Sequence, residues 1–247
     1  MKYLLELENV SKKYKRFSLK DISFSVSPGV ITGFVGINGA GKSTTIKIIA
    51  DLIKKDNGVL RFFGEERKSK YTNELIGYVM DSSYFYEKQT LKSIKNTISG
   101  TYRNWNENDY QRYLDLFLLD ESQKVEELSK GMKMKYALAL ALSHNARLLI
   151  MDEPTSGLDP LIRSQIISVL KEFIADGTRS VLFSTHITSD LEKVAKNIIF
   201  IHDGKIVFNE ALSNISSLHK KIIGTDFMTL EDCIIDFIEY MKRGNGI

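Results

Sequence analysis

The chain has 247 residues, of which 43% are hydrophobic and 26% charged, a balance that is typical of a folded globular protein and unlike that of a disordered chain. Its formal net charge of +3, from 34 basic and 31 acidic side chains, lacks the dense basic footprint of nucleic-acid binders, so no nucleic-acid partner is expected. The single cysteine, Cys233, excludes an intramolecular disulfide and indicates a reducing compartment.

No stretch of the chain is as apolar as a membrane-spanning helix. The longest uninterrupted apolar run extends over 137–142, far short of the roughly 18 residues that a spanning helix requires. Glu6 and Glu8 interrupt the apolar residues near the N-terminus, which is not the pattern of a secretory signal. The sequence therefore predicts a chain that does not cross a membrane and that reaches one only through a partner.

Hydrophobic patterns divide the chain into strands and helices that alternate over most of its length. Strands are predicted, in chain order, at 3–10, 22–26, 30–35, 58–64, 76–80, 147–151, 179–184, 198–201 and 206–208. Helices are predicted at 46–53, 91–119, 130–143, 161–175, 189–195 and from 229 onwards. This alternation favours an α/β fold with a mostly parallel sheet covered on both faces. The antiparallel-looking start and the helical stretch at about 83–130 are interpreted as additions to that core.

A glycine-rich loop follows the buried strand predicted at 30–35 and precedes a helix. It consists of Gly36, Ile37, Asn38, Gly39, Ala40, Gly41, Lys42 and Ser43, and it matches the P-loop pattern in the required setting. The backbone N–H groups of such a loop and the positive end of the following helix bind phosphates. Lys42 would contact the β- and γ-phosphates, Ser43 would bind Mg²⁺, and Thr44 and Thr45 would donate to the α-phosphate. The loop therefore predicts a site for ATP and Mg²⁺.

Two adjacent carboxylates follow the buried strand predicted at 147–151. Ligands of parallel α/β sheets bind outside the carboxyl ends of the strands. Asp152 is expected to hold the hydrated Mg²⁺, and Glu153 to polarise the attacking water as a general base. His186 ends the strand at 179–184 on the same edge, where a contact with the γ-phosphate is favoured over a purely structural role.

A further motif lies upstream of these carboxylates, in Leu128-Ser129-Lys130-Gly131-Met132. It resembles the signature motif of the ATP-binding cassette (ABC) family, which other P-loop NTPases lack. The segment Ser156-Gly157-Leu158-Asp159 resembles the D-loop of that family, His186 its switch histidine, and Tyr14 the aromatic residue that stacks on adenine. From about Leu4 to Phe208, the chain is therefore similar to the nucleotide-binding subunit of an ABC transporter.

The resemblance implies an α/β P-loop NTPase fold with a mostly parallel, RecA-like core, an N-terminal antiparallel β-subdomain and an inserted helical subdomain. The chain would form a single ABC ATPase domain. Within it, 1–82 and 146–210 would make the nucleotide-binding core with the β-subdomain, 83–145 the helical subdomain with the signature, and 211–247 a C-terminal helical extension.

The resemblance also implies a head-to-tail dimer with a second copy or with a paralogous ATPase subunit. Each ATP would lie between the P-loop of one subunit and the signature of the other, where Ser129, Lys130, Gly131 and Asp159 would contact it in trans. Hydrolysis would drive a separate transmembrane permease subunit. This would place the chain in the cytoplasm, peripheral on the cytoplasmic face of the cell membrane.

Two sites depart from the commoner motifs of the family. Lys130-Gly131-Met132 replaces Gly-Gly-Gln in the signature, so Lys130 would add positive charge near the trans nucleotide, while Met132 lacks the hydrogen bonds of an amide. Asp81 stands where the glutamine of the Q-loop is expected. It would either approach Mg²⁺ through water or be an ordinary loop acid, and the sequence leaves both interpretations open.

Both departures resemble cassettes that serve separately encoded exporter membrane subunits, as does the tail Thr229-Leu-Glu-Asp-Cys233. The tail predicts a helix with Thr229 as its N-cap. One apolar stripe on that helix is interpreted as internal core; it consists of Leu230, Cys233, Ile234, Phe237, Ile238 and Met241.

Three consecutive aromatic residues, Tyr84-Phe85-Tyr86, follow Asp81 closely, and they suit partner docking and core packing about equally. Two alternative functions stay open on the sequence alone. One is a soluble ABC ATPase that is not coupled to transport, and the other is a nucleotide-dependent regulatory module.

Overall fold

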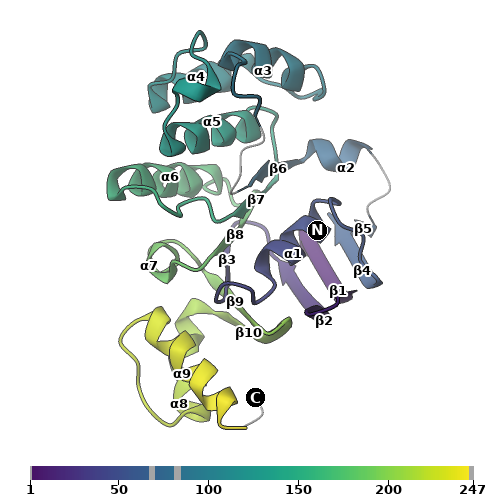
Figure 1. Ribbon diagram of the computed structural model, residues 1–247, viewed down its shortest axis with the longest axis vertical. Helices are drawn as coiled ribbons and strands as arrows, with labels where there is room; N and C mark the ends of the chain where they lie inside the picture. The colour runs from purple at the N-terminus through teal and green to yellow at the C-terminus, as the bar shows by residue number, and fades with distance from the viewer. Residues whose placement is uncertain (1, 67–69, 81–84, 245–247) are drawn as a thin grey trace.

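The structure, a computed structural model, describes residues 2–66, 70–80 and 85–244, and a six-stranded sheet runs through its middle (Figure 1). The strand order is β10-β9-β3-β8-β7-β6, and all neighbours are parallel except β10. The strands are β3 (Ile31–Val35), β6 (Ile76–Val79), β7 (Leu148–Asp152), β8 (Ser180–Thr185), β9 (Asn197–His202) and β10 (Lys205–Ala211). The predicted mostly parallel sheet is confirmed.

A second, antiparallel sheet is built mainly from the first part of the chain. Its order is β2-β1-β4-β5, with β1 (Leu5–Lys13), β2 (Ser18–Val26), β4 (Asn57–Phe62) and β5 (Glu65–Glu66). Helix α1 (Lys42–Ile49) contacts β7 and β8, and its buried isoleucines share a core cluster with β1, β2 and β4. The helix therefore fills the space between the two sheets.

The strands of the central sheet are hydrophobic throughout because both faces are covered. Along β7, Leu148 and Ile150 belong to the core cluster around α1, whereas Leu149 and Met151 belong to a larger cluster on the opposite face. Alternation with a period of two sends successive side chains to opposite faces of a strand. An uninterrupted apolar run is therefore required here.

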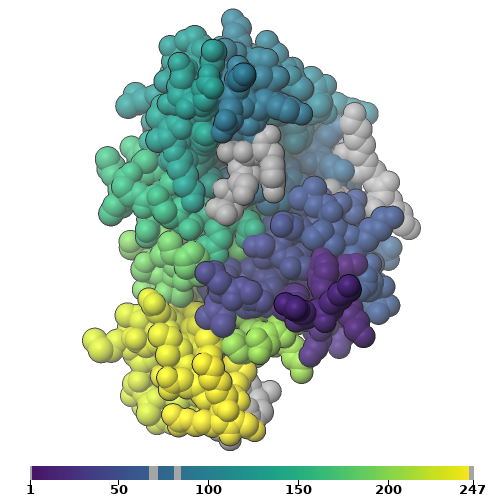
Figure 2. Space-filling view, viewed as in Figure 1, coloured from purple at the N-terminus to yellow at the C-terminus, as the bar shows by residue number. Residues whose placement is uncertain are grey.

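Three helices pack over the larger cluster beside β6 and β7 and form a lobe at one end of the molecule (Figure 2). They are α3 (Leu91–Ser99), α4 (Glu107–Phe117) and α5 (Lys130–Leu142). The predicted helical stretch at 91–119 is two helices, because the Asn106 side chain accepts the N–H groups of Asn108 and Asp109 and starts α4 anew.

Beyond β7 the chain forms α6 (Pro160–Phe173), and between β8 and β9 it forms the short α7 (Thr188–Leu191). The predicted helix at 189–195 is shorter than expected, since it ends at Leu191 and turns follow. The helix α2 (Lys70–Glu74) precedes β6. None of the helices in the described part of the chain is long and apolar enough to span a membrane.

Two further helices, α8 (Ile215–Ile222) and α9 (Leu230–Lys242), make a lobe at the other end of the molecule (Figure 2). The Thr229 side chain accepts the Asp232 N–H while Asp232 accepts the Thr229 N–H, which confirms the predicted N-cap. The predicted stripe is part of the core, with Cys233 fully buried among it. Burial raises the pKa of the Cys233 thiol to about 12, so the sulfur stays an unreactive thiol at neutral pH.

Candidate functional site: a phosphate loop facing an acidic edge

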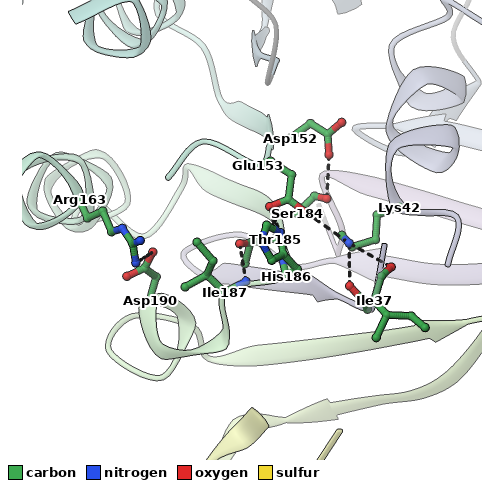
Figure 3. A network of polar contacts seen from close by, with 11 residues as sticks. Ile37, Lys42, Asp152, Glu153, Arg163, Ser184, Thr185, His186, Ile187 and Asp190 are labelled. Carbon is green, nitrogen blue, oxygen red and sulfur yellow. Dashed lines mark hydrogen bonds and ion pairs between the residues drawn. The ribbon is translucent and has the colours of Figure 1, made fainter. Parts of the chain in front are cut away.

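The candidate site lies where β3, β7 and β8 end side by side. In the register of the sheet, Val35 pairs with Thr185, and Asp152 pairs with Ser184. The segments that follow these strands therefore leave the sheet at one edge (Figure 3). Because all three strands are parallel, this edge is the carboxyl edge, where α/β folds bind their ligands.

The loop after β3 depends on glycine at defined positions. A Cβ on Gly36 would lie 2.4 Å from the backbone oxygen of Ile201, so no larger residue fits beside β9. Gly41 adopts a φ of 117°, a conformation that favours glycine, immediately before α1 begins. Asn38 and Gly39 are exposed at the tip of the loop, whereas Ala40 is buried and its N–H donates to Ile37 O. The tip is thus the part of the loop that a ligand can reach.

Lys42 holds its charge at the mouth of this loop. Its side chain is 5% exposed, and its Nζ donates to Gly36 O at 2.7 Å and to Ile37 O at 3.4 Å. The same ammonium lies 3.4 Å from Glu153 Oε1. A cation is therefore fixed between the phosphate loop and the acidic edge, within reach of both (Figure 3).

Asp152 and Ser43 offer hard oxygen atoms at the start of α1. Ser184 Oγ donates to Asp152 Oδ1 at 2.9 Å, and the Ser43 hydroxyl interacts with the same carboxylate. Burial raises the pKa of Asp152 above its usual range, although these hydroxyls act in the opposite direction. Within the described residues, no group of three or more histidine, cysteine or acidic side chains could cage a metal. One carboxylate and one hydroxyl suit Mg²⁺, which keeps water and takes further oxygens from a nucleotide.

Glu153 and His186 are in direct contact. His186 Nδ1 lies 2.7 Å from Glu153 Oε2, and the His186 N–H donates to the same oxygen at 3.3 Å. Glu153 has a φ of 50°, an arrangement that costs a residue other than glycine about 1–3 kcal/mol and that clusters at functional sites. The two segments after β7 and β8 are therefore joined at the residues predicted to be catalytic.

Most of these residues line one open cavity of about 720 Å³, whereas Asp152 lies behind its wall, in contact with Ser43. Its wall comprises Arg16, Phe17, Asn38, Gly39, Gly41, Lys42, Ser43, Thr44, Glu153, Ser156 and His186. The sequence did not single out Arg16 and Phe17, although they lie only two and three residues after Tyr14, the residue expected to stack on adenine. Tyr14 lies outside this wall and is 42% exposed, with the Lys12 ammonium 5.9 Å from its ring centroid.

Thr45 corrects one prediction. Its side chain is fully buried, and its hydroxyl donates to Gly41 O at 2.9 Å. Thr45 is absent from the cavity wall, whereas Thr44 lies in it. Thr45 therefore stabilises the first turn of α1 from within, and its predicted contact with the α-phosphate is withdrawn.

The signature segment starts α5. Ser129 is the N-cap, and its Oγ accepts the Met132 N–H at 3.2 Å. A Cβ on Gly131 would lie 2.4 Å from Cδ1 of Ile162 in α6, so the absence of a side chain lets the two helices approach. In the described part of this chain, the cavity wall includes no residue of the signature segment.

Asp159 and Lys130 lie near this helix pair. Asp159 is the N-cap of α6, where its Oδ1 accepts the N–H groups of Leu161 and Ile162, both at 3.0 Å. The Lys130 Nζ lies 3.4 Å from the point that a Cβ on Gly157 would occupy. Gly157 precedes Asp159 in the predicted D-loop, so the unusual lysine of the signature covers that loop.

We predict that Lys130→Gly weakens ATP-dependent dimerisation more than it changes the ATP affinity of the monomer. Lys130 lies beside the D-loop and away from the wall of the cavity. Sedimentation of the Glu153→Gln protein in ATP and Mg²⁺, with and without Lys130→Gly, measures the association of subunits. Equilibrium binding of ATP at a low protein concentration measures the ATP affinity of the monomer. Equal effects on both quantities would contradict the prediction.

The aromatic segment divides between two environments. Phe85 packs on Tyr136 of α5, with 5.4 Å between ring centroids, whereas Tyr86 is 77% exposed. Phe85 therefore belongs to the core, and Tyr86 is available to a partner. Asp81 and Tyr84 lie outside the described residues, so both interpretations of Asp81 stay open.

Comparison with known proteins identifies the family of the chain. The sequence profile of the ABC transporter family matches residues 19–156. The bacitracin transport ATP-binding protein BcrA of Enterococcus faecalis is 31% identical over 90% of this chain and 72% of that protein. The phosphonates import ATP-binding protein PhnC of Treponema denticola is 31% identical over 89% of this chain and 94% of that protein.

Among solved structures, an ATP-binding subunit of an ABC transporter superposes with a TM-score of 0.84 at 29% identity, covering 95% of this chain and 99% of that one. The profile match includes the phosphate loop, the signature segment and Glu153. The chain therefore belongs to the ABC transporter family, as an ATP-binding and ATP-hydrolysing subunit.

Proposed function

We propose that this subunit hydrolyses ATP at the cavity between the phosphate loop and the edge carrying Glu153. The observation that carries this proposal is the convergence of Lys42, Glu153 and His186, from three different segments, in one wall. Lys42 binds the β- and γ-phosphates, and the exposed loop tip donates its backbone N–H groups to them. Glu153 accepts the proton of the attacking water, and His186 orients Glu153 and contacts the γ-phosphate.

Mg²⁺ belongs to the same proposal. Ser43 and Asp152 would hold the ion through oxygen, and it would neutralise charge that develops on the phosphates. Asp152 is buried and is oriented by the Ser184 hydroxyl, so the carboxylate already points at the start of α1. Phe17 in the wall and the exposed Tyr14, three residues before it, would offer aromatic surface to the adenine ring.

The composite nature of the site is supported by where the signature lies. Ser129 and Gly131 begin α5 outside the cavity wall, and Asp159 begins the neighbouring α6. We assign these residues, with Lys130, to the ATP held by a second subunit, either a copy of this chain or a paralogue. The segments 1–82 and 146–210 then act as the nucleotide-binding core, 83–145 as the helical subdomain, and 211–247 as a C-terminal extension.

We further propose that the subunit works on the cytoplasmic face of the membrane with a separate permease, and that the transport is export. The signature Lys130-Gly131-Met132 and the capped helix at Thr229 support an exporter-type cassette. The relative BcrA is a bacitracin transport ATP-binding protein, which supports a role in transport, whereas the direction of transport rests on the signature and the tail. Tyr86, an exposed aromatic residue next to the helical lobe, is the proposed contact with the permease.

We predict that Tyr86→Ala separates the subunit from its permease without affecting ATP binding. Affinity-tagged full-length chain, recovered from detergent-solubilised membranes of its own cells, should bring with it a polypeptide that has several spanning helices and no phosphate loop. Tyr86→Ala should lower that recovery at least about fivefold, the effect of losing a contact worth about 1 kcal/mol. Met228→Ala removes a side chain that is 94% exposed elsewhere and is the matched control. Recovery of the wild-type chain without a spanning partner would contradict the transport assignment.

A further inference from the structure

Two segments that carry residues of the proposed site run side by side. One extends from Glu153 to Asp159 after β7, and the other from His186 to Leu191 after β8. The 2.7 Å contact between Glu153 and His186 joins them at the sheet. A second contact, farther from the sheet, involves Arg163 of α6 and Asp190 of α7 (Figure 3).

Arg163 is tied to the first segment by a hydrogen bond. Its Nε donates to Leu158 O at 3.0 Å, directly before Asp159. The Arg163 N–H also donates to Asp159 O at 3.1 Å, which fixes the side chain close to the start of α6. The guanidinium therefore follows any displacement of the Leu158–Asp159 turn.

The other end of the guanidinium faces Asp190. The Arg163 Nη1 lies 3.9 Å from Asp190 Oδ2. The Asp190 side chain is only 3% exposed, and its Oδ2 accepts no hydrogen bond from the described residues. A buried carboxylate without compensation is costly, because burial strips its water and removes its hydrogen bonds. Within the described part of the chain, Arg163 makes the one ion pair of Asp190.

We propose that Arg163 and Asp190 form a positioning pair, which holds the segment carrying His186 in register with the segment that runs from Glu153 to Asp159. The pair fixes the far ends of both segments, so that the His186 imidazole and the Glu153 carboxylate keep their contact at the near ends. Through Leu158, a subunit that docks on Asp159 acts on the same guanidinium. The inference rests on the proposed roles of Glu153 and His186.

The distance leaves the pair room to tighten. At 3.9 Å the Arg163–Asp190 contact is an ion pair but not a hydrogen bond, since a hydrogen bond between these groups spans about 2.7–2.9 Å. A displacement of about 1 Å at the Leu158 turn closes or opens it. A shift of that size at a catalytic contact is enough to change turnover up to about 10²-fold. The guanidinium thereby links subunit contact to the geometry of His186.

The surroundings of the pair supply matched controls. Arg163 and Asp190 line a cleft of about 420 Å³ together with Lys171 and Lys193, whose side chains are exposed. Lys171 lies on the same helix as Arg163 but makes no ion pair with Asp190. Lys171→Gln therefore removes a cation from the same cleft without touching the pair.

The test compares Arg163→Gln, Asp190→Asn, the double variant and Lys171→Gln in the full chain. Arg163→Gln leaves Asp190 buried and uncompensated, so it should lower the thermal midpoint; Asp190→Asn and the double variant leave no buried lone charge. Asp190→Asn should lower kcat about tenfold, within the range that small displacements produce, with KM for ATP changed less than about twofold. The double variant should be no slower than Asp190→Asn, and Lys171→Gln should match the wild type.

Four outcomes decide the matter. Wild-type kcat in Asp190→Asn and in the double variant overturns the proposal. A fall in kcat that is matched by an equal fall in the fraction of protein molecules able to bind ATP shows a structural role only, and it also overturns the proposal. If Glu153→Gln leaves turnover unchanged, the proposed function itself fails, which is a result distinct from both. Loss of kcat at retained KM, without further loss in the double variant, supports the pair.

Discussion

Replacing Glu153 by glutamine should slow ATP turnover by about 10²–10⁴-fold while ATP remains bound. Glutamine keeps the size of the side chain but cannot accept the proton of the attacking water. It also removes a negative charge that lies 3.4 Å from the Lys42 ammonium, so binding of the anionic nucleotide should be retained or tightened. Phosphate release at saturating ATP and Mg²⁺ measures the turnover, and equilibrium titration with labelled ATP measures the binding.

The matched control for this experiment is Glu172→Gln. Glu172 is an exposed glutamate in α6 that pairs with Arg112, far along the helix from the cavity wall. It should leave both turnover and binding at wild-type values. A Glu153→Gln protein that turns over ATP at the wild-type rate would refute the assignment of Glu153 as general base, and with it the catalytic part of the proposed function.

Lys42→Ala should lower the affinity for ATP by about 30-fold or more. The ammonium and the phosphates would form a buried, hydrogen-bonded charge pair, and truncating one partner of such a pair costs about 2–5 kcal/mol. The Lys42 ammonium is already held at the loop mouth by Gly36 O and Glu153. Its charge is therefore in place for the phosphates and needs little reorganisation. Removing the Lys42 ammonium also leaves the Glu153 carboxylate without this neighbouring cation, so its negative charge repels the triphosphate more strongly.

The control for this second variant lies on the same helix. Lys47 is exposed near the end of α1, and Lys47→Ala should leave ATP affinity unchanged. Thermal unfolding of both variants distinguishes a loss of binding from a loss of fold. An affinity within twofold of the wild type in Lys42→Ala, with an intact thermal midpoint, would be incompatible with a phosphate-binding role for this loop.

The sequence allowed much of the fold and the core of the site to be predicted, because the decisive residues follow buried strands directly. A strand such as β7, with both faces covered, is an uninterrupted apolar run, and Asp152 ends it. Residues at the carboxyl ends of neighbouring parallel strands must lie close together at one edge of the sheet. The helices that pack on the sheet could be located by a different signal, because their apolar residues repeat with the helical period.

Other features depend on contacts between segments that are distant in the sequence. Thr45 faces the interior because α1 packs between two sheets, and no local pattern separates it from Thr44. Phe17 reaches the cavity wall only because β2 begins beside Gly41, whose Cβ would lie 3.0 Å from the Phe17 ring. Arg163 and Asp190 look like ordinary surface charges in the sequence, yet the fold buries the carboxylate between two helices.

The contact between Gly131 and Ile162 has a consequence for the electrostatics of the face that carries the signature. It brings the first turns of α5 and α6 together, and these turns are capped differently: α5 by the neutral Ser129, and α6 by the anionic Asp159. The positive end of the α6 dipole is neutralised by its own cap, while that of α5 stays uncompensated and is reinforced by Lys130. Two adjacent helix starts thus differ in polarity, and we expect an approaching phosphate to be attracted to the one that begins at Ser129.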